Sequence, residues 1–180
     1  MNIFKSFEEE KNFVLEKLDL LYDSIQDLHC EGKISFQKNM KLINETIQQL
    51  KPILANRANL DDQVIFPFAS KHIPLLEPMI NFLKAERNEF TAQLKSFEVL
   101  LQKLIQGHTG AANHALLKKL CEKGTYVVCI ARNHVQAEAE GVYKVLDQKL
   151  KFFEKKELHK FIHEHIKKSG GVLKGEKRKE

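Results

Sequence analysis

The chain has 180 residues, of which 43% are hydrophobic and 29% charged, a composition typical of one globular domain. Much of its formal charge of +5 lies in the C-terminal stretch KKSGGVLKGEKRKE, so the remaining chain is close to neutral. In this remaining part, basic residues do not alternate with aromatic ones, so nucleic-acid binding is not expected. No apolar run is long enough to span a membrane, so a membrane span is not expected either.

The cysteines and the N-terminus indicate a cytoplasmic protein. Cys30, Cys121 and Cys129 form neither a CxxC motif nor a paired framework, so reduced thiols are expected. The N-terminal stretch MNIFKSFEEEKNF turns acidic too early for a signal peptide.

Apolar spacing predicts helices throughout, and the first two can be bounded by local signals. The first helix should start after Ser6, with Glu9 completing a capping box, and end near Gly32. The second should start after Ser35, kink at Pro52 and end at Phe66–Pro67, because proline disrupts a helix interior.

The remaining chain predicts three more helices and a tail. The third helix should run from Pro74 or Pro78 to Gly107, and the fourth from Ala111 to Leu150, with Gly124 as a weak point. A shorter fifth helix should cover residues 155–168. We therefore expect an all-α fold, an antiparallel up-down four-helix bundle with an additional short C-terminal helix, over residues 1–168. Residues 169–180 should form a basic, disordered tail.

Each long helix has an apolar stripe that charged or polar residues interrupt at one place. Beyond its interruption, the stripe of the second helix continues at Val64 and Phe68. That of the fourth helix continues at Gly141 or Val142 and then at Val145. In an antiparallel bundle the interruptions can share one level, and buried charges must be paired. The interrupting residues are Lys11, Arg57, Asp61, Arg87, His134 and Glu138. The alternative for Lys11 is that it points outward and Glu10 takes its place on the stripe.

Several segments resemble the hemerythrin-like (HHE cation-binding) family. RANLDDQVIFPF and HVQAEAEGVYKVL are similar to its His-x-x-x-Glu motif, MINFLKAERNEF to its third helix, and LHCEGKIS to its first turn. The resemblance covers roughly residues 8–165. It implies a four-helix bundle that holds two iron ions and a role in binding or sensing oxygen, iron or redox state.

The resemblance places the family's ligands on particular residues of this chain. The first-helix histidine falls at Lys11 or Asn12, the second-helix motif at Arg57 and Asp61, and the third-helix histidine at Arg87. Only the fourth-helix pair, His134 and Glu138, matches in full. An arginine has no lone pair for a metal, and each close repulsion between unit charges costs roughly 4 kcal/mol at an effective dielectric of about 20.

These substitutions lead to two hypotheses about function. In the first, the cations replace the metals, the site is a buried ion-pair network, and the protein is a non-enzymatic regulatory or interaction protein without a cofactor. In the alternative, iron, as a di-iron centre or a single metal ion, binds at His134, Glu138 and Asp61 for sensing or storage. An enzymatic role would need such a metal and an open coordination position. The sequence names no protein partner and no oligomeric state.

The C-terminal motif HKFIHEH is a separate candidate site. His159 and His163 are one turn apart, with His165 beside them, and such a pair can bind zinc or nickel weakly. We favour the interpretation that this helix packs in the ordinary way and that its histidines are exposed and bind no metal.

Overall fold

The computed structural model describes residues 3–28, 33–106 and 111–168, and every element within these ranges is helical, with no strand. None of the described helices is both long enough and apolar enough to cross a membrane. The elements are α1 (Ile3–Asp27), α2 (Lys33–Leu60), a π-helical turn η1 (Asp61–Ile65), α3 (Phe66–His72), a 3₁₀ turn η2 (Pro74–Leu76), α4 (Glu77–Ile105), α5 (Ala111–Glu138), a second π-helical turn η3 (Ala139–Tyr143), α6 (Lys144–Lys149) and α7 (Phe152–Lys168).

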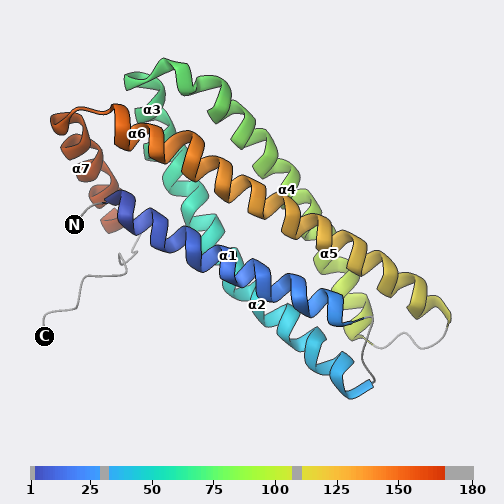
Figure 1. The fold of residues 1–180 in the computed structure, drawn as a ribbon. Coiled ribbons are helices and arrows are strands. Elements are labelled where there is room, and N and C mark those ends of the chain that lie inside the picture. Colours follow the sequence, from blue (N-terminus) through green and yellow to red (C-terminus); the bar gives the residue numbers. More distant parts are fainter. Residues whose placement is uncertain (1–2, 29–32, 107–110, 169–180) are drawn as a thin grey trace, which may run out of the picture.

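The long helices pack lengthwise into a helical bundle. Figure 1 shows α1 beside α2 and α5, and α4 beside α5. The shorter α7 packs across the α2–η1 region at the end of the bundle where the described chain begins. The described part of the chain is therefore all-helical, as the apolar spacing predicts.

The core is divided into two apolar clusters. On α1, Phe7 belongs to one cluster and Val14 to the other, and on the α5–η3 helix Val142 and Val135 are separated in the same way. The buried charged residues Arg57, Asp61 and Glu138 lie between the two clusters. A charged layer thus separates two apolar halves of the bundle.

The first helix does not start where the sequence predicts. It begins at Ile3, so Ser6 lies inside α1 and the expected capping box with Glu9 is wrong. Phe4 packs against Phe7 with ring centroids 6.3 Å apart, and this contact extends the apolar face beyond Ser6. The expected end at Gly32 lies outside the described residues, as does the tail 169–180.

The second helix begins earlier and ends later than predicted. Lys33, not Ser35, opens it, and the helical course continues through Pro67 to His72. In η1 the N–H of Phe66 bonds to the carbonyl of Asp61, five residues back. This wider turn starts α3 afresh with Pro67 in its first turn, where a missing N–H costs little. The fifth helix also begins before residue 155, at Phe152.

Gly124 does not interrupt the fourth helix but allows close packing. A Cβ atom at this position would lie 2.7 Å from Ile25 Cδ1 and 2.7 Å from Phe97 Cε2. Only glycine lets α5 approach α1 and α4 this closely without displacing those side chains.

Candidate functional site

The charged layer is built by three of the long helices. Arg57 and Asp61 come from the end of α2 and the start of η1, Arg87 comes from α4, and Glu138 ends α5. Asp61 and Glu138 have no exposed side-chain surface, and Arg57 and Arg87 expose only 5% and 14% of theirs. Such groups must pair with one another, because an unpaired buried charge is costly.

Arg57 is held mainly by Glu138. Its Nε donates a hydrogen bond to Glu138 Oε2, and its Nη1 lies 3.3 Å from Glu10 Oε1 on α1. The guanidinium carbon lies 5.0 Å from the centre of the Tyr143 ring. The third nitrogen, Nη2, is buried and has no hydrogen-bond partner among the described residues.

Arg87 connects the two buried carboxyl groups. Its Nη2 lies 2.9 Å from Asp61 Oδ2 and 3.4 Å from Glu138 Oε1. Its Nη1 donates to the carbonyl oxygen of Ala58 at 3.2 Å and lies 3.1 Å from Asp62 Oδ1. Arg87 therefore ties α4 to both α2 and α5.

Tyr143 completes the coordination of Asp61 and was not singled out by the sequence. Its hydroxyl donates to Asp61 Oδ1 at 2.6 Å. The sequence stripe places Val142 and Val145 after Glu138, but η3 widens the turn, so Val142 and Tyr143 are buried and Val145 is half-buried. The Arg57–Asp61 and His134–Glu138 pairs are each followed by a π-helical turn, a feature that often marks functional sites.

His134 lies at the edge of the network. Its Nδ1 is 3.1 Å from Glu86 Oε2, and its Nε2 is 4.0 Å from Glu138 Oε1. Burial, with Arg87 contributing, lowers the pKa of His134 against the opposing effects of Glu138 and Glu86. A neutral ring with its Nδ1–H donating to Glu86 fits this environment.

Lys11 does not join the network, so this part of the expected cluster is wrong. Its ammonium pairs with Glu8, one turn earlier on α1. Glu10 instead supplies the contact from α1, because it lies beside Arg57 Nη1. Without Lys11, the two buried arginines formally balance the two buried carboxyl groups.

Burial and mutual contact shift the pKa values of the network in different directions. Burial and the nearby Glu138 raise the pKa of Asp61 well above its usual value. Burial acts to raise the pKa of Glu138 too, but Asp61, Arg57 and His134 outweigh it and lower that pKa. Burial also raises the pKa of Tyr143, so its hydroxyl remains a donor.

The residues present do not fit the iron site that the family resemblance implies. All four carboxylate oxygens of Asp61 and Glu138 receive hydrogen bonds or ion-pair contacts from Arg57, Arg87 or Tyr143. A metal ion would have to displace both guanidinium groups from these oxygens. Over residues 3–28, 33–106 and 111–168, no group of three His, Cys, Asp or Glu side chains is arranged to hold a metal.

The C-terminal histidines do not converge. The rings of His159 and His163 stack with centroids 5.7 Å apart, whereas His165 Nε2 lies 3.4 Å from Asn59 Nδ2. The helical spacing separates His165 from the stacked pair, because residues two apart do not share a face.

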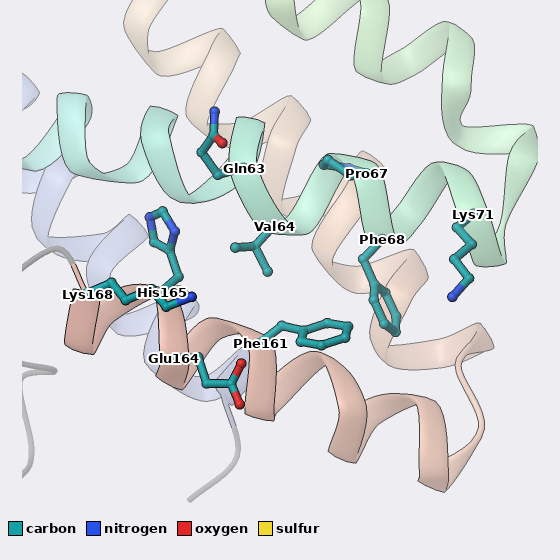
Figure 2. A pocket seen from close by; sticks show the side chains of 9 residues that line it. All are labelled: Gln63, Val64, Pro67, Phe68, Lys71, Phe161, Glu164, His165 and Lys168. Carbon is teal, nitrogen blue, oxygen red and sulfur yellow. The ribbon is translucent and has the colours of Figure 1, made fainter.

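A groove of about 410 Å³ lies between the η1–α3 segment and α7. Figure 2 shows Phe161 of α7 extending beneath Val64 toward Phe68, and the two phenyl rings are 6.1 Å apart. Its lining includes no member of the buried network, so the groove and the network are separate features.

Comparison of the sequence with known proteins gave no match to any family model and none to any curated protein.

Proposed function

We propose that this chain is a hemerythrin-like, antiparallel up-down four-helix bundle in which arginine side chains have taken the place of iron. The colour gradient of Figure 1 runs in opposite directions along α1 and α2 and along α4 and α5, which supports this topology. The π-helical turns beside Asp61 and Glu138 give the two motifs the same local setting.

The observation that carries the proposal is the saturation of the two buried carboxyl groups. Arg57 and Arg87, at the positions of two family histidines, contact the same carboxylates that would otherwise hold a metal. Each guanidinium provides fixed positive charge and several donors in one plane, so it can neutralise a carboxylate and saturate its oxygens without a metal.

The way these groups are used supports a non-enzymatic role in regulation or protein interaction. Asp61 and Glu138 are engaged as acceptors inside the bundle, so neither is placed as a general base for a substrate. Large apolar side chains are exposed elsewhere: Leu75 by 91%, Phe152 by 65% and Phe153 by 80%.

The exposed apolar residues lie at one end of the bundle, because His72 at the end of α3 contacts Glu154 at the start of α7. Exposed apolar patches commonly mark protein interaction sites. Replacing Phe152 and Phe153 with serine should weaken cross-linking to a partner in cell extract without changing the circular dichroism. Equal cross-linking of wild type and variant would contradict a role of these exposed residues in protein interaction.

Iron content tests the proposal. Wild type purified from iron-rich medium should contain only trace iron, whereas Arg57→His combined with Arg87→His should increase iron uptake. Arg132→His, which alters a surface pair with Asp19, is the control for an added histidine. Stoichiometric iron in wild type would defeat the proposal, and no uptake by the double variant would show that these positions do not match the family's ligands.

A further inference from the structure

A cavity of about 210 Å³ adjoins the charged network between α2, α4 and α5. Its walls are mainly apolar, and the residues that form them include Leu54, Ala58, Phe90, Leu94, Ala131 and Val135. Arg57, Arg87 and Glu138 of the network also line it. The cavity therefore combines an apolar body with a charged wall.

The charged wall contains an unused donor. Lys51, Arg57, Arg87 and Glu138 line the cavity, and the cations are paired, Lys51 with Glu98 and Arg87 with Asp61. Arg57 is buried, and its Nη2 has no acceptor among the described residues. A buried donor without a partner is costly, so an acceptor beside Arg57 would be stabilised.

The apolar part of the cavity extends toward the core. A smaller space, lined by Leu18, Leu21 and Val127 among others, shares Leu54, Phe90 and Leu94 with the larger cavity. Both lie between α2 and α4, which pack mainly against α1 and α5 and make little direct contact with each other. An apolar chain that entered from the network side would find apolar walls along this seam.

We propose that this cavity binds a small amphipathic carboxylate. The carboxylate accepts hydrogen bonds from Arg57 and is attracted by Arg87, and the apolar body lies against Leu54, Phe90 and Leu94. A cavity of about 150 Å³ can hold a benzene ring, so a body of about six to eight carbons matches this one. The inference rests on the proposed function only in that arginines, and not a metal, face the cavity.

Isothermal titration calorimetry with ligands of one length and different head groups tests the inference. Octanoate should bind at a single saturable site, octanol about tenfold or more weakly, and octylammonium not measurably, because the same cations repel it. Absence of octanoate binding, or equal binding of octanol, would overturn the inference. If the protein contains no iron and does not bind octanoate, the cavity proposal is wrong and the proposed function is unaffected. Stoichiometric iron would contradict both the proposed function and the cavity proposal.

A cavity-filling variant locates the site. Ala131 is buried and lines the cavity, so Ala131→Leu should weaken octanoate binding by about tenfold or more. Ala115→Leu makes the same change at an exposed position of the same helix and should bind as wild type does. Ala55→Phe at the exposed rim serves as a second blocking variant if circular dichroism shows that Ala131→Leu misfolds. Unchanged octanoate affinity in a folded blocking variant would refute the location.

Discussion

Arg87 on α4 reaches Asp61 at the start of η1, with 2.9 Å between Nη2 and Oδ2. The same nitrogen lies 3.4 Å from Glu138 Oε1, so one guanidinium joins three helical segments that are distant in sequence. Because the network lies between two apolar clusters, removal of one member would leave another charge buried without its partner. Its contribution to stability can be measured one side chain at a time.

Glu138→Ala should destabilise the fold by about 3–5 kcal/mol, because Arg57 would remain buried without its main partner. Urea unfolding followed by circular dichroism measures the change in the free energy of unfolding. Glu140→Ala is the matched control, since Glu140 is two residues away, exposed and paired with Lys144 on the surface. The control should unfold nearly as wild type does, and equal losses in both variants would argue against a buried network.

Tyr143→Phe should cost about 1–3 kcal/mol, because Asp61 Oδ1 would lose its hydroxyl donor inside the protein. Tyr126→Phe removes a hydroxyl from an exposed tyrosine of α5 and should change stability by less than about 0.5 kcal/mol. Thermal and urea unfolding of both variants make the comparison. A Tyr143→Phe protein as stable as the control would mean that the Tyr143–Asp61 contact contributes nothing.

The raised pKa of Asp61 predicts a particular dependence of stability on pH. Between the ordinary aspartate pKa, about 4, and the raised value, the folded state binds more protons at Asp61 than the unfolded state does. The stability that Asp61 contributes should therefore fall as pH rises through this window. Asp61→Asn cannot titrate there.

The free energy of unfolding of wild type minus that of Asp61→Asn should thus decrease with increasing pH above about 4. Glu138, whose pKa is lowered, acts in the opposite direction: its contribution is lost as pH falls through its folded pKa. The two carboxyl groups interact, so the difference between wild type and Asp61→Asn is more informative than the pH dependence of either protein alone. A difference that rises with pH would show that the arginines dominate the titration of Asp61.

Helical periodicity predicted most of the candidate site. The residues Arg57, Asp61, Arg87 and Glu138 come together as the apolar stripes indicate, with His134 at their edge. Their common level follows from regular spacing of three and four residues on straight helices. All-helical structure was predictable for the same reason.

The remaining differences arise where the helices depart from regular spacing. Each π-helical turn advances the buried face by one residue. Turn η3 places Tyr143 inside the network, and turn η1 leaves Val64 half-buried. Such turns have no simple pattern in a single sequence, and η1 also explains why Pro67 does not end the helix. Lys11 was misplaced because a long, flexible side chain can turn to a neighbour such as Glu8.

The central claim is that guanidinium groups, not metal ions, lie against the oxygens of Asp61 and Glu138. Anomalous diffraction at the iron absorption edge, from crystals of protein produced in iron-rich medium, tests it most directly. The account predicts electron density for Arg57 and Arg87 against both carboxylates and no anomalous peak between them. An anomalous peak coordinated by Asp61, Glu138 and His134, with the arginines turned away, would contradict it.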